Sequence, residues 1–314
     1  MSKEIGGYFE LETYGADFFH PKAILLNSAR NALRYIIRAY RIKTLNVPYF
    51  TCPVIWDSIK SENCNIAFYD IDENFMPLKD FDNSEYILVN DYFGICGRNI
   101  CELSSKYTNI IVDNAQSFFS KPYGLASFYS PRKFFGLPDG GLLLCKKQLD
   151  EQFEQDVSYG RMTHLLKRYD LGATAGFEDF QKNDNSLKQE PIKYMSALTF
   201  ALMGNINYAK ASDRRKNNFD YLGSELGAIN ELKIDENTDP PMVYPLLVKN
   251  EHLRKKLIDN KIYIARYWDG IERVAPPDSC AVYLKDYLLP LPIDQRYTIE
   301  EMKHIVDIVK TEAI

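Results

Sequence analysis

Short apolar runs that alternate with helical patterns fill residues 44–145, and they limit the possible fold more than any other feature. Most of these runs are apolar at consecutive positions, so both faces of each strand are expected to be covered. Helices are predicted between them at 53–61, with Pro53 in the first turn, and at about 100–107. The pattern predicts an α/β fold with a mostly parallel sheet flanked by helices. The predicted strands are 44–48, 65–70, 86–90, 109–113 and 141–145.

Residues 28–40, which precede this series, have the spacing of an amphipathic helix. Ala29, Leu33, Ile36, Ile37 and Tyr40 fall on one stripe. The residue before the stripe is Ser28, whose hydroxyl suits an N-cap. The first N–H groups of such a helix can also receive a phosphate.

The second half of the chain has a different pattern. Residues 173–191 are polar and rich in helix-breaking residues, so a loop is predicted there, and one or two helices follow at 191–225. Beyond the break at Pro240-Pro241, we expect a smaller sheet accompanied by two helices. A chain of 314 residues exceeds the size of one typical core. We therefore predict a large α/β domain at 1–190 and a smaller α+β domain at 191–314. The predicted elements of the smaller domain are strands at 242–248, 263–264 and 283–289 and helices near 250–259 and 298–312.

Composition narrows the functional classes. A net charge of −5 gives no basic footprint, so nucleic acid is not the expected partner. The start has no apolar signal-peptide core and no stretch is long enough to span a bilayer, which predicts a cytoplasmic protein without membrane contact. The six cysteines form no CxxC pair and the four histidines are scattered, so no metal site is expected.

Lys133 lies in a turn with glycines on its C-terminal side, and Asp113 ends an apolar strand twenty residues earlier. This order of groups suits pyridoxal phosphate (PLP) chemistry. A lysine amine forms a Schiff base with the cofactor aldehyde, and an aspartate keeps the pyridine nitrogen protonated so that the ring accepts electrons.

Each signal has a simpler explanation when it is taken alone. A lysine in a turn is usually a solvated surface group, and an aspartate at a strand end can cap the next helix. Here the signals occur together and in order along the chain, as Asp113, Gln116, Lys133 and Gly140-Gly141. The predicted α/β pattern also places a ligand site at the carboxyl ends of the strands. Together these features favour PLP binding over the simpler explanations. A nicotinamide-binding alternative lacks the G-x-G-x-x-G motif, and no P-loop is present.

With these residues in place, the chain resembles the DegT/StrS-type nucleotide-sugar aminotransferases, which are PLP enzymes of the aspartate-aminotransferase fold, fold type I. The resemblance extends from about Ser28 to the end of the chain. Segments similar to the family's motifs are 28–33, 48–52, 68–72, 91–94, 113–116, 133–141 and 288–292.

The resemblance implies specific roles for the residues in these motifs. Lys133 would be the Schiff-base lysine and proton shuttle, and Asp113 would pair with the pyridine nitrogen. Gln116 would hydrogen-bond near the ring hydroxyl. Ser28, with the backbone of Ala29 and Arg30, would hold the phosphate.

The chain departs from the family's pattern at three places. The usual Gly-Thr is Ala29-Arg30, so Arg30 either adds charge to the phosphate site or reaches a substrate group. The position of the ring-stacking aromatic is Cys52, which leaves the stack absent or moved to Tyr49, Phe50 or Tyr92. The serine that binds phosphate before the lysine is either Ser127 or Ser130.

The resemblance thus implies a homodimeric aminotransferase that moves an amino group from an amino acid to a nucleotide-linked keto-sugar. The apolar stretch 194–203 and the Tyr-rich N-terminal segment are the expected buried surfaces.

Two alternatives remain open. One is a non-catalytic relative that keeps the fold, and the other is a PLP enzyme with a non-sugar substrate or a different outcome such as dehydration. The retained lysine argues against dehydration, because the dehydratase variants of the family replace it with histidine.

Overall fold

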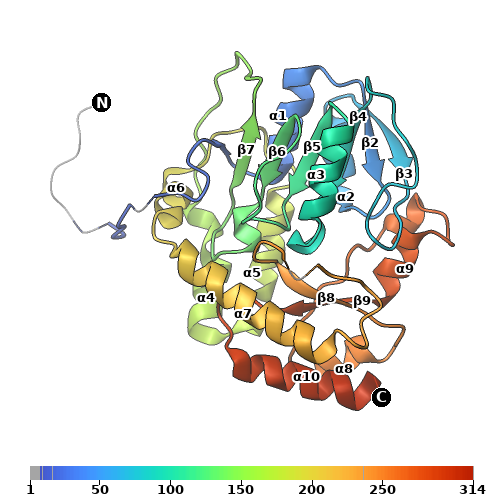
Figure 1. Cartoon of the computed structure of the whole chain (residues 1–314). Coiled ribbons are helices and arrows are strands. Elements are labelled where there is room, and N and C mark those ends of the chain that lie inside the picture. Colours follow the sequence, from blue (N-terminus) through green and yellow to red (C-terminus); the bar gives the residue numbers. More distant parts are fainter. Residues whose placement is uncertain (1–7, 9, 16, 236, 314) are drawn as a thin grey trace.

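The computed structural model describes residues 8, 10–15, 17–235 and 237–313, which form a large seven-stranded sheet and a small two-stranded sheet (Figure 1). The large sheet has the order β1-β7-β6-β5-β4-β2-β3. Its strands from β6 to β3 run parallel, whereas β7 and β1 are antiparallel to their neighbours. The strands are β1 (Ile24–Leu26), β2 (Thr44–Pro48), β3 (Asn65–Tyr69), β4 (Tyr86–Asn90), β5 (Ile110–Asn114), β6 (Ala126–Tyr129) and β7 (Gly141–Cys145).

The predicted mostly parallel sheet is therefore confirmed, together with all five predicted strands. Their burial explains why they were recognisable, because β5 is buried at every residue. The sequence analysis missed β1 and β6, which are shorter than the others. In β6 the polar Ser127 interrupts the apolar run, and β1 has only three residues.

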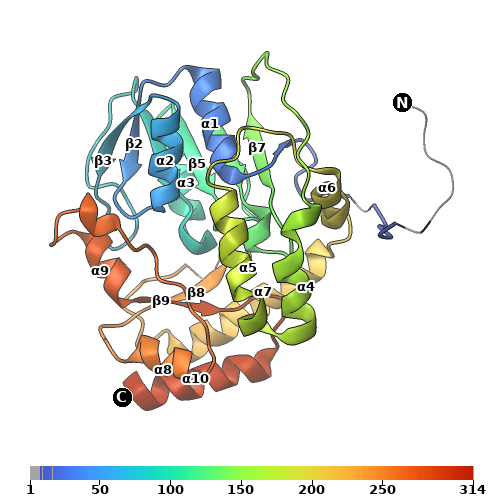
Figure 2. The ribbon, with the colours of Figure 1, turned by 180° about the vertical axis from the view of Figure 1, so that it is seen from behind.

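Helices cover both faces of the large sheet. α1 (Ala29–Tyr40) and α2 (Pro53–Ser61) lie on the face toward the viewer in Figure 2, and α3 (Gly97–Lys106) lies on the opposite face. The predicted cap of α1 is confirmed, since the Ser28 hydroxyl accepts a hydrogen bond from the Asn31 N–H at 3.2 Å. Pro53 occupies the first turn of α2, as predicted.

The prediction of a loop at 173–191 is wrong for most of its length. α4 (Thr163–Leu171) and α5 (Ala173–Ser186) form a helical hairpin beside the sheet. The polar composition hid this helix because its stability comes from packing against α4 and from ion pairs such as Lys167–Asp179 and Glu178–Lys182.

Of the remaining helices, α6 lies beside the large sheet, whereas α7, α8, α9 and α10 lie around the small sheet, whose two strands are antiparallel. The predicted strand at 263–264 is absent, and 283–289 begins as a helix that Ser279 caps, with strand only from Leu288. Buried Ala281 and Leu284 sit one turn apart, so helix packing overrides the apparent strand pattern there. The elements are α6 (Ala197–Met203), α7 (Tyr208–Leu226), β8 (Val243–Leu247), α8 (Leu253–Asp259), α9 (Cys280–Tyr287), β9 (Leu288–Pro292) and α10 (Ile299–Ala313).

The buried apolar side chains form two clusters, and α7 contributes to both. Ala211, near its start, belongs to the cluster around the large sheet, whereas Phe219 and Leu222 belong to the one around the small sheet. Met195 and Met203 pack in the first cluster. The domain boundary expected near residue 190 stays a prediction.

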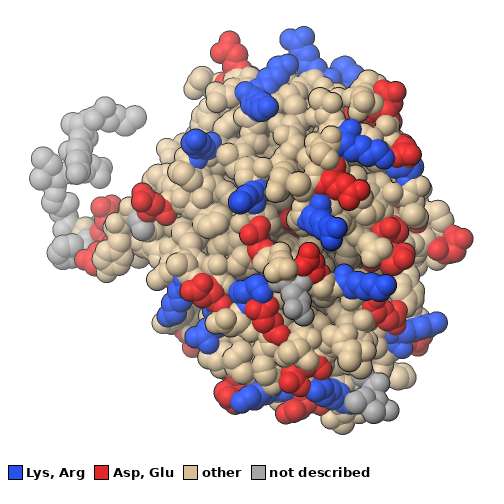
Figure 3. Space-filling view, in the orientation of Figure 1, with Lys and Arg blue, Asp and Glu red and all other residues tan. Residues whose placement is uncertain are grey.

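The outer surface is mixed in charge. On the face shown in Figure 3, Lys and Arg side chains are interspersed with Asp and Glu. In the part of the chain that the structure describes, no helix has both the length and the apolar character needed to cross a bilayer.

Candidate active site

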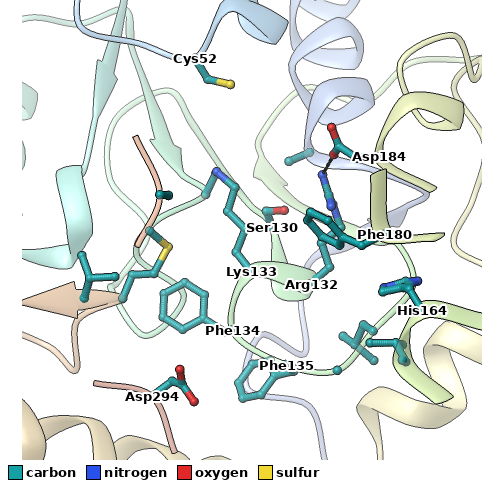
Figure 4. A pocket seen from close by; sticks show the side chains of 18 of the residues that line it. Cys52, Ser130, Arg132, Lys133, Phe134, Phe135, His164, Phe180, Asp184 and Asp294 are labelled. Atoms are coloured by element: carbon teal, nitrogen blue, oxygen red, sulfur yellow. Dashed lines mark hydrogen bonds and ion pairs between the residues drawn. The ribbon is translucent and has the colours of Figure 1, made fainter. Parts of the chain in front are cut away.

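A cleft of about 1130 Å³ lies between the large sheet and the small one. Its lining includes the start of α1, Asp113 from β5, the turn around Lys133, the α4–α5 hairpin and residues of β8 and β9. Figure 4 shows the lysine turn in this cleft together with His164, Phe180 and Asp184 of the hairpin. Parallel strands β5 and β6 end at this cleft. This is the edge of an α/β sheet at which ligands ordinarily bind.

Lys133 ends a short 3-10 turn that begins directly after β6. Pro131 opens the turn, and the Lys133 N–H donates to the Ser130 carbonyl at 3.1 Å. The side chain is accessible from the cleft yet lies deep within the protein. Burial therefore lowers the pKa of Lys133, with nearby Cys52 and Asp113 acting in the opposite direction. A lowered pKa increases the fraction of free amine, which is the nucleophilic form.

Asp113 lies at the carboxyl end of β5 and faces the same cleft. Its Oδ1 accepts a hydrogen bond from the Ala115 N–H at 2.8 Å. Burial raises the pKa of Asp113 to about 6, although Lys133 and the Ala115 N–H oppose the shift. The carboxylate is thus under-compensated and would be stabilised by a cation placed in the cleft.

The start of α1 borders the cleft through Ser28, Ala29 and Arg30. The chain approaches itself closely here, because a Cβ on Gly141 would lie only 2.2 Å from the Ser28 carbonyl carbon. Glycine at the start of β7 is therefore required for this arrangement. The first N–H groups of a helix have no partner within it, so this corner suits an anion.

Two charged residues that sequence reasoning missed complete this corner. Asp184 of α5 accepts hydrogen bonds from Arg132 at 2.6 Å and from Arg30 at 3.0 Å. The polar composition of its segment, which favours a loop, hides Asp184 from the sequence analysis. Arg132 has no local signal beyond its place next to Lys133, although the two side chains point in different directions (Figure 4).

The structure separates the two candidate serines. Ser130 lines the cleft, whereas the hydroxyl of Ser127 donates to the Tyr123 carbonyl at 2.9 Å, outside the cleft lining. The end of β6 explains why only one of them lines the cleft, because Ser127 lies within this strand and Ser130 lies just past its end.

Tyr92 and Gln116 also lie outside the lining of the cleft. The Tyr92 hydroxyl donates to the Phe50 carbonyl at 2.7 Å, and the Gln116 Oε1 accepts from the Phe93 N–H at 3.2 Å. The Nε2 of Gln116 is buried and has no hydrogen-bond partner among the described residues. Direct contacts of these side chains with a cofactor stay predictions.

Cys52 does line the cleft, at the N-cap of α2. Burial raises the pKa of the Cys52 thiol, while Lys133 opposes the shift. Two further aromatic side chains that line the cleft are Tyr267 and Trp268, and Trp268 packs on Phe50 with ring centroids 4.9 Å apart. Unlike Tyr92, these two rings belong to the lining of the cleft.

Arg215 of α7 links the segment before β8 to the lysine turn. It is fully buried and donates to the carbonyl of Phe134 at 3.2 Å and to that of Met242 at 3.0 Å. Gln295 donates to the same Phe134 carbonyl at 2.7 Å. Burial lowers the pKa of Arg215 to about 10, which leaves the guanidinium charged at neutral pH. These donors fix the backbone of the residue that follows Lys133.

Comparison with known proteins finds similarity in fold. No family model matches the sequence, and no curated protein matches it. Solved structures do match. Spr1654 from Streptococcus pneumoniae in its PLP form has a TM-score of 0.67 at 16% identity, over 93% of this chain and 87% of that one. A DegT DnrJ EryC1 StrS aminotransferase from Brucella abortus has a TM-score of 0.62 at 14% identity, over 93% and 86%.

A further solved structure is the GDP-4-keto-6-deoxy-D-mannose-3-dehydratase of E. coli with bound hydrated PLP. Its TM-score is 0.62 at 14% identity, over 91% of this chain and 87% of that one. The chain therefore has the fold that these solved structures share, and the predicted fold type I is confirmed.

Proposed function

We propose that the protein is a PLP-dependent aminotransferase that uses Lys133 as its covalent attachment point. The observation that carries the proposal is the pair formed by Lys133 and Asp113, which face one cleft and influence each other's pKa. When bound, PLP would supply an electron sink for a carbanion next to its ring.

The residues present fit the cofactor. The carboxylate of Asp113 lacks full compensation in the cleft, so it can hold a proton at the pyridine nitrogen. Ser28, Ala29, Arg30 and Ser130 border the corner that suits a phosphate. The amine of Lys133, once released from the cofactor, can move a proton at the reacting carbon as a general acid and base.

We infer an amino acid as donor and a keto-sugar, nucleotide-linked, as acceptor. Support comes from the structures of similar fold, which include an aminotransferase and a dehydratase acting on a nucleotide-linked keto-sugar. The cleft is large enough for a cofactor and a second ligand, since its volume reaches the upper range of small-molecule sites. We place the enzyme in the cytoplasm, in keeping with its six free cysteines.

The absorption spectrum of purified protein loaded with PLP tests this function. We expect a visible band from PLP attached to Lys133, and conversion of the band to a near-ultraviolet one when glutamate is added. The amino group has then moved to the cofactor. A visible band that no amino acid alters would contradict the aminotransferase assignment and favour a non-catalytic relative. No band at all would remove PLP from the proposal.

We also propose that the protein forms a homodimer. The two segments expected at the interface lie side by side, because the Tyr14 N–H donates to Asn205 at 2.7 Å and Phe18 contacts Phe200 with ring centroids 4.6 Å apart. Tyr14 and Phe200 are exposed, at 88% and 46%. Exposed apolar groups that gather in this way mark an association surface.

Sedimentation tests the dimer. We expect a dimer at micromolar concentration for the parent protein and a shift toward monomer for Phe200→Glu, because a charge would be buried in the interface. Leu78→Glu, an exchange at an apolar side chain that is 64% exposed in the segment before β4, serves as a control with no expected shift. A parent protein that sediments only as a monomer would exclude this interface.

A further inference from the structure

One carboxylate holds two guanidinium groups at the wall of the cleft. The Oδ1 of Asp184 accepts hydrogen bonds from Nη2 of Arg132 and from Nη2 of Arg30, and the Nη1 of Arg30 donates to the Asp184 backbone carbonyl at 3.4 Å. Figure 4 shows Asp184 and Arg132 turned toward each other beside the hydroxyl of Ser130. The three charged groups come from α5, α1 and the lysine turn, so Asp184 joins segments that are far apart in the sequence.

The charges of this cluster do not cancel. Two cations share one anion, and all three side chains are mostly buried, with exposed fractions of 13% for Arg30, 16% for Arg132 and 31% for Asp184. Burial and the charge of Arg132 lower the pKa of Arg30, whereas Asp184 opposes both effects. Although burial acts against it, the two arginines lower the pKa of Asp184. Without the carboxylate, the two guanidinium charges would repel each other, because both approach the same oxygen of Asp184.

Most donors of the two arginines remain available. A guanidinium carries five N–H groups, and among the described residues Arg132 donates only to Asp184. Arg30 donates only to the side chain and backbone of Asp184 in the same part of the chain. Both arginines line the same cleft as Ser130 and the start of α1, so a ligand at this corner can meet guanidinium, hydroxyl and amide donors together.

We propose that Asp184 is a positioning residue, which holds Arg30 and Arg132 side by side so that their free N–H groups bind the phosphate of PLP. The inference rests on the proposed function and adds Arg132 and Asp184 to the phosphate site. Paired guanidinium groups bind phosphate through charge-assisted hydrogen bonds, and a fixed geometry removes the cost of ordering two long side chains.

The opposite role for Asp184 makes a different prediction. If its carboxylate occupied the place of the phosphate, its removal would strengthen phosphate binding. Asp184 uses a single side-chain oxygen for both arginines, and among the described residues Arg132 makes no other hydrogen bond, so its remaining N–H groups can meet a phosphate. This geometry favours an anchor over a competitor.

The test compares two ligands that differ only in the phosphate, PLP and pyridoxal, by equilibrium binding to the full chain. We expect Asp184→Asn to weaken PLP binding about tenfold or more and to change pyridoxal binding by less than about twofold. Asp184→Glu should restore part of the PLP affinity. Asp179→Asn, which removes the ion pair with Lys167 at 2.6 Å on the same helix, is the matched control and should leave the ratio of the two affinities unchanged.

Each other outcome overturns the inference. Equal weakening of PLP and pyridoxal by Asp184→Asn would mean that Asp184 only supports the fold of the hairpin. Tighter PLP binding would mean that Asp184 competes with the phosphate. Unchanged PLP binding in a parent protein that attaches PLP to Lys133 would defeat this inference alone, whereas a parent that binds neither compound would defeat the proposed function as well.

Discussion

The variant Lys133→Ala is expected to lose all covalently attached PLP while still binding the cofactor through Asp113 and the phosphate corner. Lys133 has two tasks in the proposed function, since its amine attaches the cofactor and then moves a proton at the reacting carbon. Loss of the proton transfer alone lowers turnover by roughly 10²–10⁴-fold. Borohydride treatment followed by peptide mapping should therefore find PLP on Lys133 of the parent protein and on no residue of the variant.

Neighbouring lysines provide controls for this experiment. Lys121, Lys146 and Lys147 are exposed and do not belong to the lining of the cleft, so their amines would not meet the cofactor. Lys146→Ala should leave both the adduct and the spectrum unchanged. An adduct on one of these three lysines in the parent protein would mean that the turn after β6 has been misinterpreted, and the aminotransferase assignment would then be abandoned.

The parts of the site that sequence could predict are those tied to a strand end. Asp113 closes a fully buried strand, so its place at the carboxyl edge of a parallel sheet follows from the pattern of β5 alone. Lys133 could be predicted as the reactive lysine because it lies after Asp113 and before Gly141 in the chain. The structure brings both to one cleft, and their chemical roles stay predictions.

The parts that sequence could not predict depend on long-range packing. Asp184 comes from α5, whose many polar residues favour a loop until α4 packs against it. The choice between Ser127 and Ser130 depends on where β6 ends. This strand is too short and too polar to be recognised in the sequence. The contact of Arg215 with the Phe134 carbonyl joins residues about eighty positions apart, and no local pattern encodes such a pair.

Asp113→Asn is expected to slow the reaction with an amino donor by orders of magnitude. The neutral amide cannot hold a proton on the pyridine nitrogen, so the ring withdraws electrons less effectively. The change keeps the shape of the side chain and an oxygen that can accept from the Ala115 N–H. PLP should therefore still attach to Lys133 in the variant. Rapid mixing of PLP-loaded protein with glutamate measures the rate, and a near-normal rate would remove Asp113 from this role.

The same variant should be more stable than the parent protein when both lack PLP. Burial raises the pKa of Asp113 from its ordinary value of 3.8 to about 6. Folding therefore favours the protonated carboxyl, and the parent loses stability as the pH rises from about 4 through about 6. Above that range the loss approaches about 3 kcal/mol, since each pKa unit corresponds to about 1.4 kcal/mol.

The uncharged Asp113→Asn variant escapes this loss because it has no charge to bury. We expect thermal unfolding at pH 7.5 to show it more stable by about 1–3 kcal/mol, with the difference vanishing below about pH 4. Addition of PLP should stabilise the parent more than the variant, since the pyridinium compensates a carboxylate but not an amide. If the two proteins instead unfold alike at every pH, the Asp113 carboxylate is already compensated in the empty cleft. The electrostatic fit to the cofactor would then lose its basis.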